Sequence, residues 1–242
     1  MDSDVLSPVP TLARSPFATS TTARAIDAYK YYLDAGDEPV HALDGVSLEV
    51  RAGEMVALVG PSGCGKSTLL NLIGCVDLPT RGTIEVDGRA TSSLDDDALT
   101  GLRRERIGTI FQFFNLLPAM TIAENVALPL VLQRVARAEI DARVAAALAL
   151  VGIAEKARAY PSQVSGGQMQ RAAVARATIH KPAIVLADEP TGNLDSHSGA
   201  NVLRLLRDVA SNGQAILMAT HSMEAAAVCD RVIRMQDGKI VG

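Results

Sequence analysis

Membrane-spanning segments are absent from this sequence of 242 residues. Its apolar residues come in short runs, such as residues 183–187, and no run approaches the roughly 18–20 residues that cross a bilayer as a helix. The first residues, Met1-Asp2-Ser3-Asp4, have neither the basic start nor the apolar core of a secretory signal peptide. We therefore expect a protein with no membrane span of its own and no secretory signal.

The sequence also lacks a basic stripe and a pattern of paired cysteines. The formal net charge is −4, and the basic run at residues 103–106 is interrupted by Glu105. Such a run is typical of a solvated helix end, whereas a nucleic-acid surface needs a continuous basic patch, so we expect no nucleic acid among the partners. The three cysteines, Cys64, Cys75 and Cys229, are odd in number and lack metal-ligand spacing, which indicates reduced thiols in a cytosolic protein.

What the sequence does contain is a short leader followed by one domain. Residues 1–23 are rich in Ser, Thr, Pro and Ala without periodicity, so we interpret them as a disordered leader. The alternative is a regulatory tail, but no residue in it indicates chemistry. The remaining residues, 24–242, are enough for one domain of ordinary size, with or without an inserted subdomain.

Strand-sized and helix-sized patterns alternate at both ends of this domain. Between them, Ile140, Val144, Leu148 and Val151 recur at helical spacing, and Gly152 follows where a helix would end. This arrangement predicts an α/β fold in which a mostly parallel sheet is interrupted by a helical insertion. The expected strands are residues 42–50, 55–59, 83–86 with a hairpin turn at 87–88, 107–111, 184–187, 215–219 and 232–235, and the expected helices outside the insertion are residues 66–73 and 202–209.

The strongest chemical motif is a glycine-rich loop between the strand at 55–59 and the helix at 66–73. It fits G-x-x-x-x-G-K-[ST], in which backbone N–H groups wrap around phosphate and the helix N-terminus adds its positive end. We expect Lys66 to reach the β- and γ-phosphates and the Ser67 hydroxyl to ligate Mg²⁺. The loop predicts nucleotide binding, but it does not separate a kinase, a GTPase and a transport ATPase. The residues expected to hold nucleotide here are Gly60, Pro61, Ser62, Gly63, Cys64, Gly65, Lys66, Ser67 and Thr68.

Two carboxylates, Asp188 and Glu189, follow the apolar strand at residues 184–187. The carboxyl end of such a strand faces the phosphate loop, so we expect Asp188 to hold Mg²⁺ through a water. Glu189 points elsewhere and is free to orient or deprotonate the attacking water, which makes it the expected general base. Two acids before Pro190 could instead begin a turn, but the phosphate loop favours the catalytic interpretation.

A second anion site is predicted at Val164-Ser165-Gly166-Gly167-Gln168, where a small polar turn opens a helix. One chain has no use for two such sites on one nucleotide. Two chains arranged head to tail do, because each can present its Ser165 turn to the γ-phosphate bound on the other's loop. The sequence therefore predicts a dimer of two copies in which Ser165, Gly166, Gly167 and Gln168 contact nucleotide.

With these motifs in this order, the sequence from about residue 25 to its end resembles the ABC ATPase family. Gln112 matches the Q-loop glutamine of the family, and residues 164–168 match its signature, with Val in place of Leu. Residues 192–195 are similar to the D-loop, and His221 matches the switch histidine.

This resemblance implies an enzyme that binds ATP and Mg²⁺ and hydrolyses ATP. It implies a P-loop NTPase core with a mostly parallel sheet, a small antiparallel β subdomain, and a helical subdomain inserted at about residues 115–178. It also implies that Gln112 reaches Mg²⁺ and the membrane partner, that Asp195 lies at the nucleotide, and that His221 contacts the γ-phosphate.

One position departs from the family pattern. The family places an aromatic residue upstream of the glycine-rich loop to stack on adenine, and a gapless alignment puts Leu33 there. A shift of one residue places Tyr32 there instead. We expect Tyr32 to stack on the base; under the gapless alignment Leu33 would offer apolar contact only.

Within the family, several stretches outside the core motifs are similar to the lipoprotein-releasing and macrolide-exporting ATPases and to the cell-division ATPase close to them. These similarities lie in residues 35–38, 73–77, 102–105, 111–117 and 190–196. They imply an export or mechanotransmission motor at the cytoplasmic face of the inner membrane. A separate permease subunit with an extracytoplasmic domain would hold it there and select the cargo.

The alternative is a regulatory ATPase that drives cell-wall remodelling at division through a membrane partner, and the motifs do not separate the two. A soluble ABC protein of DNA repair or translation is disfavoured, because the sequence has no long coiled-coil insertion and no second ATPase copy.

Overall fold

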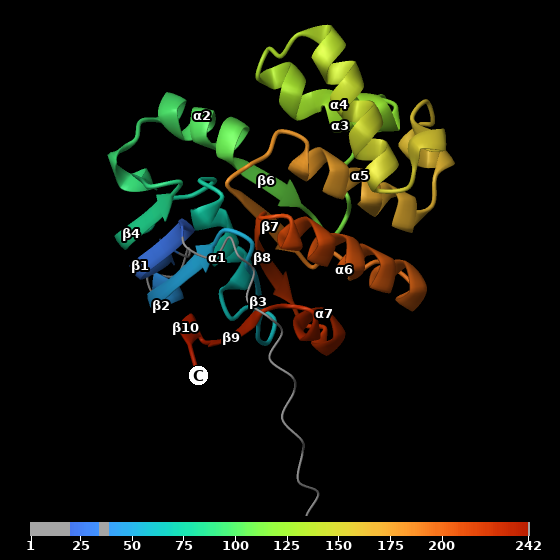
Figure 1. Ribbon diagram of the computed structural model, residues 1–242. Coiled ribbons are helices and arrows are strands. Elements are labelled where there is room, and N and C mark those ends of the chain that lie inside the picture. Colours follow the sequence, from blue (N-terminus) through green and yellow to red (C-terminus); the bar gives the residue numbers. More distant parts are fainter. Residues whose placement is uncertain (1–19, 34–38, 242) are drawn as a thin grey trace, which may run out of the picture.

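The computed structural model describes residues 20–33 and 39–241, and in these ranges the chain forms two β-sheets with helices around them (Figure 1). The larger sheet has six strands in the order β10-β9-β3-β8-β7-β6, and the smaller has four in the order β2-β1-β4-β5. No helix in the described ranges is both long enough and apolar enough to cross a membrane. The strands are β1 (Thr21–Leu33), β2 (Pro39–Arg51), β3 (Met55–Val59), β4 (Arg81–Val86), β5 (Arg89–Ala90), β6 (Ile107–Ile110), β7 (Ile184–Asp188), β8 (Ala215–Thr220), β9 (Arg231–Gln236) and β10 (Lys239–Ile240). The helices are α1 (Lys66–Ile73), α2 (Asp96–Arg106), α3 (Ile122–Leu132), α4 (Arg137–Leu150), α5 (Gly166–Thr178), α6 (Ser196–Ser211) and α7 (Met223–Ala227).

The six-stranded sheet has one edge at which several loops meet. Strands β3, β6, β7, β8 and β9 run parallel, and β10 joins β9 antiparallel. Four of the five residues of β3 are buried, as expected of a parallel strand that is covered on both faces. Because parallel strands end at the same edge of a sheet, the loops after β3, β7 and β8 come together there.

Helix α1 lies between the two sheets and is fixed by both. Its buried residues Leu69 and Leu72 belong to one core cluster with Val46 and Val86 of the small sheet and Leu58 of the large one. Full burial of a leucine of this kind stabilises a fold by about 1.5–3 kcal/mol. The small antiparallel sheet therefore packs directly against the helix that follows the phosphate loop.

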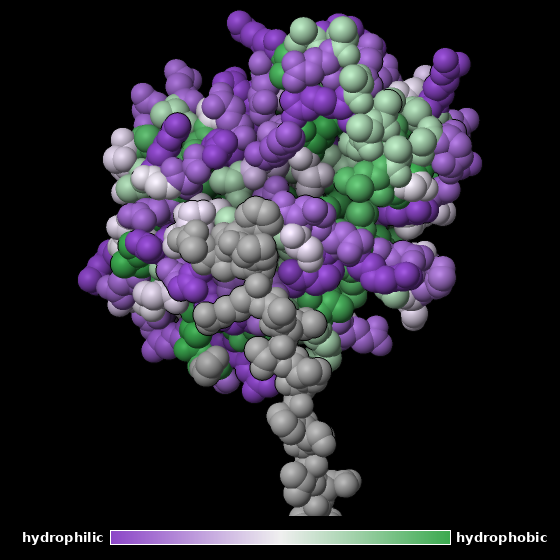
Figure 2. Space-filling view, in the orientation of Figure 1, coloured by the Kyte–Doolittle hydropathy of each residue, from purple (hydrophilic) through white to green (hydrophobic). Residues whose placement is uncertain are grey.

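Helices α3, α4 and α5 form a region of their own beside the sheets (Figure 1). They share a core cluster that includes Ile122 and Leu148, while Val174 and Ala177 of α5 pack in the cluster under β6 and β7. Helix α5 thus connects this region to the large sheet. Figure 2 shows apolar surface over this part of the molecule, where α4 turns alanines and Leu150 outward.

The predicted α/β architecture is confirmed, including the hairpin between β4 and β5, whose turn residues Asp87 and Gly88 both have positive φ. The start of the folded domain differs from the prediction. Strand β1 begins at Thr21, so residues 21–23 belong to the small sheet and not to the predicted leader. The Thr22 hydroxyl donates to the backbone oxygen of Val50 at 3.0 Å, and Ala23 is 1% exposed. Residues 1–19 of that leader lie outside the described ranges.

Candidate active site

The phosphate loop follows β3 and folds around the side chain of Lys66. Lys66 Nζ donates hydrogen bonds to the backbone oxygens of Gly60 at 2.7 Å and Pro61 at 3.0 Å. Gly65 has a φ of 102°, and a Cβ there would lie 2.4 Å from the backbone oxygen of Ala42, so only glycine fits before the helix. Helix α1 then begins without a side-chain cap, which leaves its first N–H groups available to an anion.

Asp188 ends β7 beside the first turn of α1. Ser67 Oγ donates a hydrogen bond of 3.1 Å to Asp188 Oδ2, which joins residues 121 positions apart. Burial raises the pKa of Asp188 and so does neighbouring Glu189, whereas the Ser67 hydrogen bond and the Lys66 charge oppose the rise. Two of the three residues that the sequence assigns to Mg²⁺, Ser67 and Asp188, therefore lie in contact.

The carboxylate of Glu189 is held by two residues at the end of β8. Thr220 Oγ1 donates to Glu189 Oε2 at 3.3 Å, and His221 Nδ1 lies 2.8 Å from Oε1. Glu189 has a φ of 46°, a left-handed conformation that residues with a Cβ rarely adopt. The His221 side chain is 73% exposed, and that of Glu189 is 18% exposed. The ends of β7 and β8 thus bring together the residues expected to be the base and the switch histidine.

Gln112 lies beyond the end of β6 and faces the loop after Glu189. Asn193 Nδ2 donates to the backbone oxygen of Gln112 at 3.0 Å. A Cβ on Gly192 would lie 2.9 Å from Gln112 Nε2, so the Gln112 side chain lies directly against Gly192. Gln112 and the segment that the resemblance matches to the D-loop are therefore neighbours.

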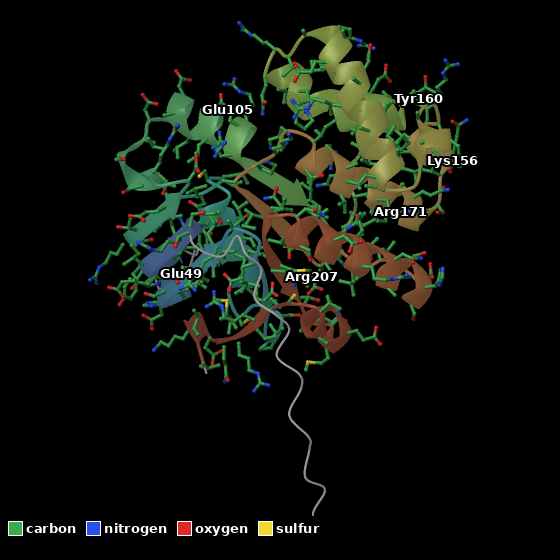
Figure 3. All side chains as sticks on the ribbon, viewed as in Figure 1. Glu49, Glu105, Lys156, Tyr160, Arg171 and Arg207 are labelled. Carbon is green, nitrogen blue, oxygen red and sulfur yellow. The ribbon has the colours of Figure 1, made fainter. Side chains whose placement is uncertain are left out.

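The Ser165 turn lies away from the phosphate loop of its own chain. Figure 1 shows α5 beginning on the side of the molecule that faces away from α1. In Figure 3, Arg171 of α5 lies across the molecule from Glu49 of β2. Helix α5, which follows the Ser165 turn, thus begins away from α1, which starts at Lys66 (Figure 1).

Two of the residues predicted to contact nucleotide, Ser165 and Asp195, also cap the starts of helices α5 and α6. The Ser165 hydroxyl accepts from the Gln168 N–H at 3.3 Å, and Gln168 Oε1 accepts from the Ser165 N–H at 3.0 Å, which is a capping box. Asp195 caps α6 in a similar way, and hydrogen bonds from Ser198 hold its pKa below the usual value. A Cβ on Gly167 would lie 2.9 Å from Ser198 Oγ, so the two helix starts touch.

Tyr32 lies near the end of β1 with its hydroxyl toward α1. Tyr32 Oη donates to Asp77 Oδ2 at 2.9 Å. Partial burial and Asp77 raise the pKa of Tyr32 while the Thr68 hydroxyl opposes the rise, so the phenol lies beside the last residue of the phosphate loop. Lys30 Nζ is 4.9 Å from the ring centroid, and Tyr32 is 40% exposed. The side chain of Leu33, the alternative for adenine, lies outside the described part of the chain.

Gln170 is a completely buried residue of α5 that the sequence motifs did not predict. Its Nε2 donates to the backbone oxygens of Pro190 at 2.6 Å and Phe111 at 3.4 Å, which are the neighbours of Glu189 and Gln112. Its Oε1 is buried without a partner. The signal for it was a polar residue among the buried apolar positions of one helix face.

A cleft of about 310 Å³ lies along β6, lined by residues of α2, α3 and α5 and by the segment after β6. Its lining includes the apolar side chains of Phe111, Leu128 and Leu132 and the basic ones of Arg103 and Arg104. Leu132 is 61% exposed. The lining suits a short amphipathic protein segment.

Arg176 of α5 also lines this cleft and fixes the turn beside it. Its guanidinium donates to the backbone oxygens of Phe114 at 2.8 Å and Asn115 at 2.5 Å. Both of these residues have positive φ, of 62° and 47°. Burial lowers the pKa of Arg176. The left-handed turn after Gln112 is therefore tied to α5.

Comparison with known sequences matches residues 43–192 to the family model described as ABC transporter. Two similar curated relatives are named macrolide export ATP-binding/permease protein MacB. The one from Hyphomonas neptunium is 48% identical over 89% of this chain, and the one from Burkholderia pseudomallei is 49% identical over 86%. The chain spans only about a third of their length, 33% and 32%.

Solved structures of ABC proteins are also similar to this chain. The dimeric ATP-binding cassette MJ0796 bound to ADP and Pi is 40% identical, with a TM-score of 0.83 over 91% of this chain and 97% of that chain. CbiO1 from Clostridium perfringens, part of the ABC transporter complex cbiONQ, is 27% identical, with a TM-score of 0.82 over 93% and 88%.

Proposed function

Because the chain belongs to the ABC transporter family, we propose that it is the ATP-hydrolysing subunit of an export or mechanotransmission complex, working as a head-to-tail dimer that drives a membrane permease partner. Family membership makes it an ATP-binding cassette with ATP hydrolase activity. The observation that carries the proposal is the meeting of Lys66, Asp188 and Glu189 at one sheet edge, with the Ser165 turn directed elsewhere.

Each residue at this edge has a task in hydrolysis. Lys66 exchanges its hydrogen bonds to the loop oxygens for the β- and γ-phosphates of ATP. Glu189 orients the attacking water and takes its proton as the water oxygen bonds to the γ-phosphorus, while the bond from that phosphorus to the β–γ bridging oxygen breaks and ADP leaves. His221, which contacts Glu189, binds the γ-phosphate. The products are ADP and phosphate.

The residues around Ser67 fit a magnesium ion. Among the described residues, no group of three His, Cys, Asp or Glu side chains could hold a metal by itself. Mg²⁺ is usually bound by one or two protein oxygens together with substrate phosphates and waters, and Ser67 and Asp188 supply such a pair of oxygens. Bound there, Mg²⁺ would neutralise charge on the phosphates. Gln112 is our third candidate for holding it.

A second copy of the chain would complete each site. The Ser165 turn would meet ATP only on a partner, since it faces away from the chain's own phosphate loop (Figure 1). The similar MJ0796 cassette is dimeric. We assign Ser165, Gly166, Gly167, Gln168 and Asp195 to contacts with nucleotide across the interface.

The cleft along β6 is the docking place that we assign to the permease. Its apolar lining and its arginines suit an amphipathic cytoplasmic segment that carries negative charge. The relatives' name includes a permease, and this chain spans a third of their length, so the permease would be the rest of a longer chain or another polypeptide. The chain would then lie at the cytoplasmic face of the inner membrane, and the permease, with its extracytoplasmic domain, would choose the cargo.

Substitutions at two exposed leucines test both parts of the proposal. Leu132 lines the cleft, whereas Leu150, 73% exposed on α4, lies outside it. Membranes that contain the permease should retain wild type and Leu150→Glu after washing but should not retain Leu132→Glu. All three proteins should hydrolyse ATP at the same rate in solution. Equal retention of Leu132→Glu would reject the cleft as the docking place. A wild-type chain without Mg²⁺-dependent ATPase activity would reject the motor itself.

A further inference from the structure

The Tyr32 ring is held by two residues outside the nucleotide-binding motifs, Lys30 and Asp77. Lys30 Nζ lies 2.6 Å from Asp77 Oδ1 and donates to the backbone oxygen of Leu78 at 2.9 Å. Tyr32 Oη donates to the other oxygen of the same carboxylate at 2.9 Å. Since the ammonium also lies 4.9 Å from the ring centroid, one face of the ring is covered by a cation.

The carboxylate of Asp77 is held in place by hydrogen bonds from three residues. The Leu78 N–H donates to Asp77 Oδ1 at 2.7 Å. Burial pushes the pKa of Asp77 up, but the hydrogen bonds from Lys30, Leu78 and Tyr32 outweigh it and lower the pKa, so the carboxylate is charged at neutral pH. The side chain of Lys30 is 13% exposed and that of Asp77 is 31% exposed, so solvent screens this pair less than a surface pair.

Asp77 is hydrogen-bonded to α1, the helix that the phosphate loop precedes. The backbone N–H of Asp77 donates to the oxygen of Asn71 in α1 at 3.3 Å. The Thr80 N–H donates to the oxygen of Tyr29 at 2.8 Å, which ties the segment after α1 to strand β1. The phenol therefore has a fixed position relative to Lys66, which begins α1.

We propose that Lys30 and Asp77 are positioning residues for adenine. They hold Tyr32 with one face against the Lys30 ammonium and leave the other face to stack on the base of a nucleotide whose phosphates bind at Lys66. The inference rests on the proposed function, because it presupposes that the loop binds ATP. It predicts that both residues contribute to the affinity for the base and not to the affinity for the phosphates.

The two contributions separate when ATP is compared with tripolyphosphate, which has the phosphates but no base. Dissociation constants of the whole chain for Mg-ATP and Mg-tripolyphosphate would be measured by calorimetry. A stacked base is worth roughly 5–150-fold in affinity, so Asp77→Ala and Lys30→Met should weaken ATP binding by about 3–10-fold and leave tripolyphosphate unchanged. Lys181→Met and Asp208→Ala, at exposed positions away from Tyr32, are the matched controls.

A double-mutant cycle shows whether Asp77 acts through Tyr32. Asp77→Ala should weaken ATP binding in the wild-type background and have no further effect in a Tyr32→Ala background. Tyr32→Phe keeps the ring and its contact with Lys30 but loses the hydrogen bond to Asp77, so its affinity should lie between those of wild type and Tyr32→Ala.

Three results would overturn the inference. The first is equal weakening of ATP binding and tripolyphosphate binding, and the second is no weakening of either. The third is that Asp77→Ala weakens ATP binding as much in the Tyr32→Ala background as in wild type. In the first and third cases Asp77 would support α1 and not the base. If Asp77→Ala does not fold, Lys30→Met and Tyr32→Phe decide the question by the same comparison. A wild-type chain that binds neither ligand would instead reject the proposed function.

Discussion

His221 Nδ1 and Glu189 Oε1 lie 2.8 Å apart, and this contact joins the ends of the neighbouring strands β7 and β8. Thr220 Oγ1 occupies the second oxygen of the same carboxylate. Both oxygens of the expected base are therefore held from the end of β8. We propose that a movement of His221 toward a γ-phosphate would release Oε1 to the attacking water and would so link substrate binding to activation of the base.

Glu189→Gln should bind Mg-ATP normally and hydrolyse it slowly. The substitution keeps the size and hydrogen bonding of the side chain but removes the basic carboxylate, so turnover should fall at least about 10²–10⁴-fold. Phosphate release and ATP binding would be measured on the same preparation. Asp188→Asn, beside Ser67, should instead alter the Mg²⁺ dependence. Hydrolysis by Glu189→Gln near the wild-type rate would move the role of base to another residue, with His221 the first to test.

Lys66→Ala and Ser165→Arg should fail at different steps. Lys66→Ala removes the charge that faces the phosphates, so ATP binding should be lost or strongly weakened. Ser165→Arg alters a turn that lies away from the chain's own loop, so each monomer should bind ATP and hydrolysis should stop. Calorimetry together with an ATPase assay distinguishes the two. Equal loss of ATP binding in both variants would contradict the shared site.

Mg-ATP should convert the chain to a dimer when hydrolysis is blocked. The interface would be completed by two γ-phosphates, so a Glu189→Gln chain should sediment as a dimer with ATP and as a smaller species without it. Ser165→Arg added to Glu189→Gln is the control and should prevent the change. A monomer at saturating ATP and high protein concentration would count against the head-to-tail arrangement.

Gln170→Leu should destabilise the fold even though leucine is of similar size. The substitution removes the donor to the oxygen of Pro190, and a buried acceptor left unpaired costs about 1–3 kcal/mol. Urea unfolding would measure the loss, with exposed Gln236→Leu as the matched control. If both variants unfold at the same urea concentration, the bridge between α5 and the segment after Glu189 contributes little to stability.

Thiol reagents should find the folded chain almost inert at pH 8. Burial raises the pKa of Cys75 to about 11 and that of Cys229 to about 12, and the thiolate is the reactive form. Reactivity should therefore rise only as the pH approaches those values, and Cys64 is shielded by being 3% exposed. Ellman's reagent would count the reacting thiols with and without urea. Rapid reaction of the native chain at pH 8 would contradict this burial.

The sequence predicted those parts of the fold in which a local pattern and a motif agree. Helix α1 begins and ends where expected, at Lys66 and Ile73, because the phosphate loop marks its start and its buried leucines set its period. The resemblance to the ABC ATPases is confirmed by the family match and the relatives. Strand β1 was missed because Asp27 has a φ of 46° and register shifts around it break the alternation that reveals a strand.

Contacts between distant segments account for what the sequence could not predict at the site. Lys30 and Asp77 are 47 positions apart, and no local pattern relates them. The helix cap formed by Ser165 could be predicted from the sequence, because S-x-x-Q at the start of a helix is the pattern of a capping box.

The left-handed backbone at Glu189 has a consequence for how this chain can change over generations. For a residue with a side chain, that conformation costs about 1–2 kcal/mol, which glycine avoids and asparagine partly avoids. Selection for heat resistance alone would therefore favour Gly or Asn here, and selection for turnover would retain glutamate. In a laboratory evolution experiment scored only on thermal survival, catalysis should decay at this position early, while the rest of the fold becomes more robust.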